Sequence, residues 1–348
     1  MPTTAQVSSP QSGHIGVLDG VRAVSILAVL AGHLLPLGPK FLQLNGVAAG
    51  CGMSLFFTLS GFLITRLLIS DNTLVDFLVR RLARIIPLAY LYCLVVFVLF
   101  RGQLSSLFYE LSFTLNYNYQ YANEFNAHLW SLCIEVQFYL IVGVLFRLLG
   151  LRAKWVILAL CLILTAMRLQ AEATYSTFTH LRGDEILTGS ILCLSTAGAL
   201  GDHRRLWSFL GGMTPVLALL LLVTCHPSGG YVACLRAYAA ALLVGSVMHS
   251  RRAWLTALLT SKPMTYIAKI SYALYIIHPA AAAGFMGGGP KWLLYMVKRP
   301  VTLAVSFALA HLSTFRFEAW WMELGRRFVS ARRAARAAVV LKPSNELA

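Results

Sequence analysis

Arg22 and His33 lie eleven positions apart within an apolar segment near the N-terminus. On a helix, eleven residues span about three turns and roughly 17 Å, so both side chains lie near the same face. An ionisable group inside a bilayer is costly unless it is paired, which makes each one a functional candidate. An arginine at the inner edge and a histidine near the midplane predict a channel entered from the cytoplasm. A hydrogen bond between His33 and a neighbouring helix explains the histidine equally well.

A short amphipathic segment, residues 77–87, carries Arg81 and Arg84 three positions apart, so a helix presents both on one face. Two guanidinium groups in this arrangement suit the binding of phosphates. Basic clusters beside a membrane span also bind lipid headgroups and set topology. For this segment taken alone, the lipid interpretation is the more frequent one.

The segment 128–139 holds a carboxylate, Glu135, about one turn inside the expected edge of a membrane span. Such a carboxylate can orient or charge a histidine, or take a proton from a hydroxyl. Trp130 suits either an interfacial aromatic belt or a platform for a sugar ring. The belt is the commoner role at this depth, but it does not explain Glu135.

Small residues recur in the segment 50–62 and let helices approach closely, so we favour tight packing there. Ser60 in this segment acts as a nucleophile only if a base lies within reach. Farther along the chain, Arg182 and Asp184 suit an internal ion pair. His278 suits a structural polar contact better than a catalytic role.

The composition indicates that these residues are carried by membrane helices. Hydrophobic residues make up 58% of the 348 residues and charged residues only 12%. Soluble chains carry about 25% charged residues, so a water-soluble enzyme, a disordered chain and a nucleic-acid-binding module are excluded. The net charge of +16 then fits basic cytoplasmic loops that face anionic lipid. The seven cysteines include no CxxC pair, so we expect neither a metal site nor a disulfide framework.

Apolar runs long enough to cross a bilayer predict an all-α, polytopic membrane helix bundle with about ten transmembrane helices. The runs lie near 21–38, 46–69, 85–101, 129–149, 153–170, 184–200, 207–225, 231–248, 266–287 and 300–319.

Lysine and arginine concentrate in alternate loops, which predicts that both termini are cytoplasmic. We expect a disordered cytoplasmic tail over 1–13, a transmembrane domain over 14–320, and a basic cytoplasmic tail over 321–348 that forms an amphipathic helix. The loop 291–299 departs from this charge pattern with three basic residues on the outer side. Either a neighbouring span is misplaced or this loop has another role.

The chain resembles the acyltransferase-3 family of integral membrane O-acyltransferases. The matching stretches occur in the family's order and spread over nearly the whole chain. They are 18–23 followed by His33, then 52–63, 80–87 and 128–139, with weaker matches at 182–184 and 271–278.

The resemblance implies a ten-helix domain that transfers an acyl group, usually acetyl, from cytoplasmic acyl-CoA to a hydroxyl. Arg22 and His33 match the family's Arg-x10-His pair, with His33 as the candidate catalytic residue. Arg81 and Arg84 match its Arg-x-x-Arg element, which is assigned to the donor side. Glu135 matches the acidic residue of its Trp-Ser-Leu segment and is a second candidate catalytic residue.

We therefore expect a membrane acyltransferase that uses acyl-CoA as a co-substrate, holds no bound cofactor, and modifies an envelope carbohydrate or glycolipid. His33 acts as a general base or is itself acylated, Glu135 orients or charges it, and Trp130 and Ser60 contact substrate. The expected location is a bacterial inner membrane, with lipids as partners and no nucleic acid. The oligomeric state and the acyl chain length are left open.

Other functions also fit these residues. A lipid or an antibiotic can replace the carbohydrate as the hydroxyl acceptor. A proton-coupled transporter or flippase for a glycolipid would use His33 and Glu135 as a proton relay and would need no CoA. In a structural or sensory membrane protein, the same polar residues would merely pair with one another.

Overall fold

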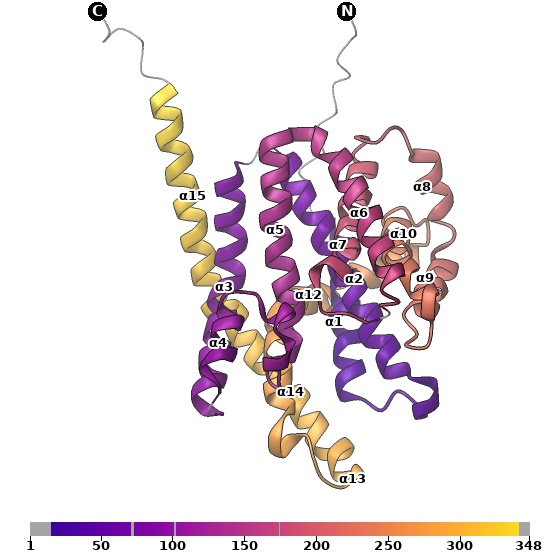
Figure 1. Ribbon diagram of the computed structural model, residues 1–348, viewed down its shortest axis with the longest axis vertical. Coiled ribbons are helices and arrows are strands. Elements are labelled where there is room, and N and C mark those ends of the chain that lie inside the picture. The colour runs from indigo at the N-terminus through magenta and orange to yellow at the C-terminus, as the bar shows by residue number, and fades with distance from the viewer. Residues whose placement is uncertain (1–14, 71–72, 101, 174, 341–348) are drawn as a thin grey trace, which may run out of the picture.

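The computed structural model describes residues 15–340, except 71–72, 101 and 174. The regular elements in these residues are all helices, which confirms the predicted all-α fold class (Figure 1). The α-helices are α1 (Gly16–Leu34), α2 (Leu44–Ile69), α3 (Leu74–Leu99), α4 (Leu104–Leu111), α5 (Trp130–Leu149), α6 (Ala153–Gln170), α7 (Thr179–Thr196), α8 (Arg204–Leu210), α9 (Thr214–Thr224), α10 (Arg236–Met248), α11 (Ala253–Leu259), α12 (Lys262–Ala282), α13 (Lys291–Leu293), α14 (Arg299–Leu312) and α15 (Ala319–Val340). The expected tail over 1–13 lies outside the described residues.

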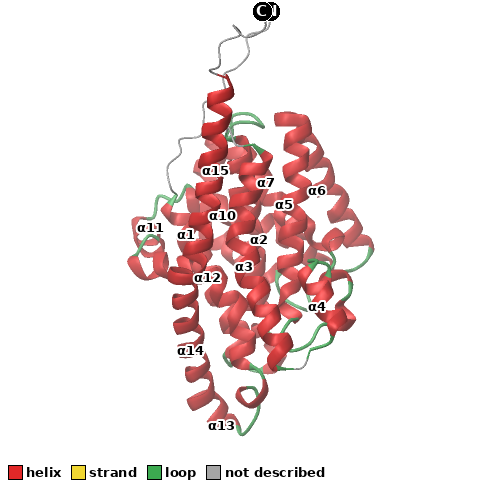
Figure 2. Cartoon of the chain, turned by 90° about the vertical axis from the view of Figure 1, so that its left-hand side faces the viewer, coloured by secondary structure: helices red, strands yellow, loops and turns green. Residues whose placement is uncertain are grey.

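Two π-helical segments join the last three α-helices into one continuous helical run. Leu294–Lys298 connects α13 to α14, and Ser313–Glu318 connects α14 to α15. Figures 1 and 2 show that α15 then lies alongside α3. Arg332 and Arg333 of α15 form ion pairs of 3.1 and 2.9 Å with Asp76, which is buried near the start of α3.

Six helical stretches of the described residues are long and apolar enough to cross a membrane, as in an integral membrane protein. A seventh is present if α8 and α9, which meet at a bend of 78°, count as one broken span. The predicted number of about ten spans is not confirmed. One apolar stretch, Ala127–Gln170, contains both α5 and α6. The helix α7 is not among the six stretches, and it carries the charged residues Arg182, Asp184 and Glu185.

The helix α2 lies at the centre of the bundle and packs against both α1 and α7. A side chain at Gly52 would place its Cβ 2.6 Å from the carbonyl oxygen of Ser25 in α1. A side chain at Gly61 would collide with the carbonyl oxygen of Ile186 in α7. The expectation that small residues in 50–62 allow close packing is therefore confirmed.

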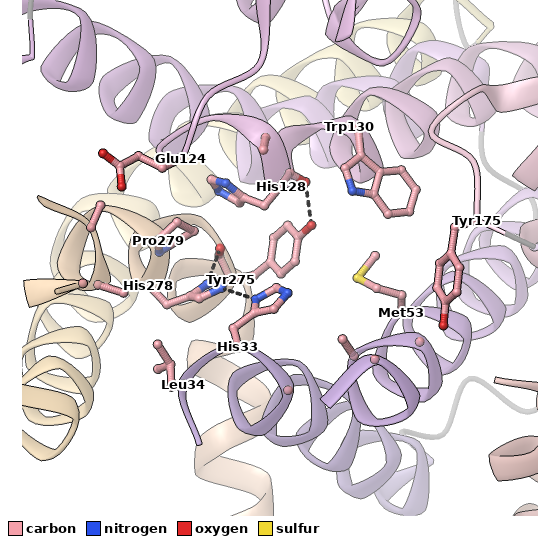
Figure 3. Close-up of a pocket in the computed structure, with 18 of the residues that line it drawn as sticks. His33, Leu34, Met53, Glu124, His128, Trp130, Tyr175, Tyr275, His278 and Pro279 are labelled. Atoms are coloured by element: carbon pink, nitrogen blue, oxygen red, sulfur yellow. Dashed lines mark hydrogen bonds between the residues drawn. The ribbon is translucent and has the colours of Figure 1, made fainter. Parts of the chain in front are cut away.

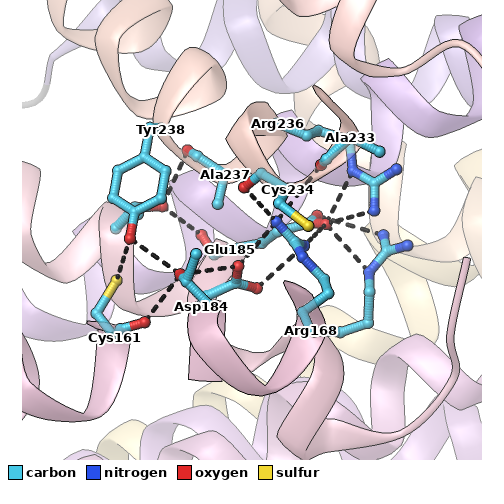
Figure 4. Close-up of polar contacts among 12 residues, drawn as sticks. Cys161, Arg168, Asp184, Glu185, Ala233, Cys234, Arg236, Ala237 and Tyr238 are labelled. Carbon is cyan, nitrogen blue, oxygen red and sulfur yellow. Dashed lines mark hydrogen bonds and ion pairs between the residues drawn. The ribbon is translucent and has the colours of Figure 1, made fainter. Parts of the chain in front are cut away.

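Buried ion pairs hold α6, α7 and α10 together (Figure 4). Arg168 lies 2.9 Å from Asp184 and 3.3 Å from Glu185. Glu185 also pairs with Arg182 at 3.1 Å and with Arg236 at 3.0 Å. Internal ion pairs were expected here, but Arg182 pairs with Glu185 rather than with Asp184. Each charge has an opposite partner, which a buried charge requires.

Candidate active site

A cavity of about 680 Å³ opens beside His33, which is exposed to it. We call it the histidine cavity (Figure 3). Its walls come from α1, α2, α5, α7, α12 and the start of α14, together with the loops that precede α5 and α7. Its polar and aromatic lining residues are His33, Tyr119, Glu124, His128, Trp130, Tyr175, Arg182, Tyr275, His278 and Arg299. This size, with a few polar groups on aromatic walls, is typical of a small-molecule site.

His33 and His278 meet in this cavity, with His33 Nδ1 lying 3.0 Å from His278 Nε2. The other ring nitrogen of His278, Nδ1, lies 2.9 Å from the carbonyl oxygen of Tyr275 and 3.1 Å from that of Leu274. A carbonyl oxygen only accepts hydrogen bonds, so His278 Nδ1 carries a proton. In a neutral His278, Nε2 is then an acceptor, and His33 Nδ1 is the donor.

This assignment leaves Nε2 of His33 without a proton, and Figure 3 shows that this nitrogen points away from His278. An unprotonated imidazole nitrogen in a cavity can take a proton from a hydroxyl or attack a carbonyl carbon. The chemistry expected of His33 is therefore compatible with its surroundings.

Aromatic and cationic side chains form the wall beside the two histidines. The guanidinium of Arg182 lies 5.1 Å from the ring centroid of Trp130 and 5.9 Å from that of Phe57. Such cation–π contacts fix the orientation of an indole ring. The hydroxyl of Tyr275 donates a hydrogen bond of 2.6 Å to the carbonyl oxygen of His128, which ties α12 to the segment before α5.

A second, smaller cavity of about 40 Å³ lies among the arginines, and we call it the basic cavity. Arg22, Arg81 and Arg84 line it together with Ser60 and Glu135. The carboxylate of Glu135 accepts a hydrogen bond of 2.5 Å from the hydroxyl of Ser60. It also accepts a short hydrogen bond from the hydroxyl of Tyr139. Three guanidinium groups around one carboxylate leave this cavity positively charged, which suits an anionic ligand.

Four helices contribute to both cavities, whereas α3 contributes Arg81 and Arg84 to the basic cavity alone. Each of α1, α2, α5 and α12 contributes residues to the basic cavity and to the histidine cavity. Phe56 lines the basic cavity and Tyr275 lines the histidine cavity, and their rings stack with centroids 6.2 Å apart. These two rings therefore stand between the cavities.

The structure divides the predicted site residues into two groups. His33 and Trp130 line the histidine cavity, and the other five, Arg22, Ser60, Arg81, Arg84 and Glu135, line the basic cavity. In the described residues His33 meets His278, whereas Glu135 binds the hydroxyls of Ser60 and Tyr139.

The sequence interpretation did not assign site roles to His278 and Arg182, which the structure places in the histidine cavity. The signal that could have found them was present. Arg182 lies in the stretch 182–184 and His278 in the stretch 271–278, and these are the two weaker matches of the family resemblance.

The sequence pattern of the family described as "Acyltransferase domain" matches residues 15–314, which include every residue of both cavities. The chain belongs to the acyltransferase-3 family. YrhL of Bacillus subtilis strain 168 is named as a candidate peptidoglycan O-acetyltransferase. It is 31% identical to the present chain over 317 residues. That match covers 76% of this chain and 48% of YrhL.

Two further relatives match shorter parts of this acyltransferase-3 chain. OatA of Staphylococcus aureus strain NCTC 8325, named an O-acetyltransferase, is 35% identical over 148 residues, or 36% of this chain and 23% of OatA. OatA of Listeria monocytogenes, named a peptidoglycan O-acetyltransferase, is 32% identical over 152 residues, or 37% of this chain and 23% of OatA. The chain thus spans about half the length of YrhL. No solved structure matches it.

Proposed function

We propose that this protein is a membrane O-acyltransferase that moves an acyl group, commonly acetyl, from cytoplasmic acyl-CoA to a hydroxyl of an envelope carbohydrate. Membership of the family and relatives named for O-acetyltransferase activity support the reaction class. The observation that carries the proposal is the hydrogen-bonded His33 in a cavity large enough for a sugar. The basic cavity, which shares four helices with the histidine cavity, supports an anionic donor.

His33 Nε2 performs the transfer by one of two routes. In the first, it takes the acceptor's hydroxyl proton as the oxygen attacks the thioester carbonyl carbon. The C–S bond breaks, and the proton passes from His33 to the departing thiolate. In the second, Nε2 itself attacks the carbonyl carbon, and the C–S bond breaks as the thiolate leaves. The acceptor hydroxyl then attacks the acyl-imidazole, the bond between the acyl carbon and Nε2 breaks, and the hydroxyl proton passes to the thiolate. Both routes give one ester and one free CoA thiol.

The donor approaches from the basic cavity. In this proposal Arg81 and Arg84 hold the phosphates of CoA, and the pantetheine arm passes Arg22 toward His33. Arg22 and His33 lie on one helix, eleven residues or roughly 17 Å apart. The basic cavity of about 40 Å³ holds only a few water molecules, so donor binding has to move side chains, including the stacked Phe56 and Tyr275.

Replacement of His33 tests the reaction. In His33→Ala, the release of free CoA thiol in the presence of acetyl-CoA and envelope glycan should fall by about 10²–10⁴-fold, the usual loss when a general base is removed. The exposed His311 on α14 lies outside both cavities, so His311→Ala should keep the wild-type rate. Full activity in His33→Ala would overturn the proposal. A glycolipid transporter would release no thiol in either protein.

The donor site has a separate test in Arg84→Ala. The KM for acetyl-CoA should rise by about tenfold or more, because a charge-assisted hydrogen bond to phosphate is lost. The KM for acetyl-pantetheine, which has no phosphate, should not change. Arg80→Ala removes an arginine that does not line the basic cavity and serves as the matched control. An equal change for both donors would contradict the phosphate contact.

A further inference from the structure

Arg299 lines the histidine cavity at the start of α14. Its Nε and Nη1 atoms are buried and have no hydrogen-bond partner among the described residues. A buried guanidinium N–H group that lacks an acceptor is unfavourable, because it has lost its hydrogen bonds to water and forms none within the protein. An anionic ligand in the cavity would supply hydrogen-bond acceptors to the guanidinium of Arg299 and reduce this cost.

The chain holds Arg299 in a defined position. The neighbouring Lys298 is buried and donates a hydrogen bond of 2.7 Å to the carbonyl oxygen of Gly288. Thr302, one turn farther on, donates to the carbonyl oxygen of Ala281 at 3.3 Å, which ties α14 to the end of α12. The π-helical segment Leu294–Lys298 directly precedes Arg299, and π-helical turns occur frequently at functional sites.

The charges around the histidine cavity leave Arg299 as a candidate for binding an anion. Arg182, the other arginine of the lining, already pairs with the buried carboxylate of Glu185 at 3.1 Å. Glu124, an exposed residue at the cavity, forms no ion pair with Arg299 within the described part of the chain. Arg299 also belongs to the basic segment 291–299, which departs from the charge pattern of the loops and is helical in the structure rather than a loop.

We infer that Arg299 forms an anion subsite of the histidine cavity and binds a carboxylate or a phosphate of the acceptor. This inference rests on the proposed function, because it assigns the histidine cavity to the acceptor. A guanidinium binds both kinds of anion through two parallel N–H groups. The acceptor is then an acidic glycan or a phosphorylated one, and Arg299 orients it so that a hydroxyl faces His33.

A binding measurement on the purified full chain tests the subsite. Isothermal titration calorimetry compares N-acetylmuramic acid with its carboxyl methylamide, and N-acetylglucosamine 1-phosphate with N-acetylglucosamine. The wild type should bind the anionic member of at least one pair about tenfold or more tightly. The pair that shows the preference identifies the anion as a carboxylate or a phosphate.

Variants assign the preference to Arg299. In Arg299→Gln the affinity ratio should fall to about one, and in Arg299→Lys it should be intermediate because the second parallel N–H group is lost. Lys291→Gln makes the same charge change at an exposed residue outside the cavity lining, and should keep the wild-type ratio. Thermal unfolding curves of all four proteins show whether each variant folds.

The inference is overturned if the wild type binds both members of each pair equally, or if folded Arg299→Gln keeps the preference. Binding requires no acyl transfer, so this test is separate from the test of the proposed function. A protein that releases no CoA thiol but prefers the anions through Arg299 would refute the transfer reaction and leave the subsite standing.

Discussion

The hydrogen bond between His33 and His278 determines which nitrogen of His33 is available to a substrate. His278 is itself held by two carbonyl oxygens of its own helix, Leu274 and Tyr275. It therefore presents a lone pair to His33 Nδ1, and His33 keeps its reactive lone pair on Nε2. In the proposed reaction His278 is a positioning residue, because it acts on substrate only through His33.

Replacement of His278 should lower kcat more than it changes KM. His278→Leu removes the acceptor for His33 Nδ1, and we expect a loss of about 10–100-fold in kcat, which is smaller than the loss of about 10²–10⁴-fold expected when the base itself is removed. His278→Asn can offer a carbonyl oxygen to the same N–H group and should recover part of the activity. The measurement is steady-state thiol release over a range of pH.

A purely structural role for His278 would give another pattern. His278→Leu and His278→Asn would then lower the amount of folded protein, and the kcat of the folded fraction and its pH profile would match those of the wild type. That outcome would contradict the positioning role.

Residue spacing predicts positions along one helix better than contacts between helices. Arg22 and His33 do share α1, as their spacing indicates. The partner of His33, however, lies 245 positions away, and Glu135 binds Ser60 across 75 positions. The helical period decides which residues of one helix share a face, whereas the packing of the whole bundle decides which faces meet. The interhelical partners could therefore not be predicted from the motifs.

At the scale of the elements, the close approach of α2 to α7 depends on two glycines. A side chain at Gly61 would meet the backbone of Ile186, and a side chain at Gly189 would meet the backbone of Thr58. Because backbone atoms cannot rotate out of the way, any added methyl group has to push the helices apart. This contact also fixes how α2 presents Ser60 and Phe56 to the basic cavity.

Gly61→Ala should destabilise the protein by about 1–3 kcal/mol, the usual cost of overpacking. The measurement is the midpoint of thermal unfolding in detergent. Gly288→Ala makes the same chemical change where no atom lies within 4 Å of the added Cβ, and should leave the midpoint unchanged. Equal midpoints for the two variants would contradict the packing argument.

Charged helices explain why the apolar pattern does not give the number of spans. The apolar run 184–200 predicts a span at α7, but Arg182, Asp184 and Glu185 leave this helix outside the six apolar stretches of the structure. Their charges are matched by Arg168 and Arg236 on neighbouring helices, so the segment is buried all the same. A hydropathy profile includes the three charges, but it does not include the partner side chains on other helices that make their burial possible.

At the scale of the whole molecule, Asp76 links the last helix, α15, to α3. It is buried near the start of α3 and pairs with Arg332 and Arg333 at the far end of α15. Its backbone N–H also donates to the hydroxyl of Thr73, which caps α3. The last helix is therefore fixed to the bundle at this point.

Asp76→Asn should weaken this link by about 1–3 kcal/mol, less than a fully buried pair because both arginines are partly exposed. Trypsin should then cleave within α15 faster than in the wild type, as seen by mass spectrometry of the fragments. Glu323→Gln removes the exposed pairs with Arg326 and Arg327 and is the matched control, since exposed pairs contribute about 0–1 kcal/mol. Equal cleavage rates in the two variants would argue against the link.

The π-helical turn before α14 has a consequence for how this cavity can change during evolution. A π turn holds one residue more than an α turn, so deletion of one residue within Leu294–Lys298 can restore an ordinary α-helix. Each residue of an α-helix accounts for about 100° of rotation but only about 1.5 Å of length. The π turn absorbs the rotation of its extra residue, so a single-codon deletion there can leave Arg299 on the same side of its helix and keep the cavity lining.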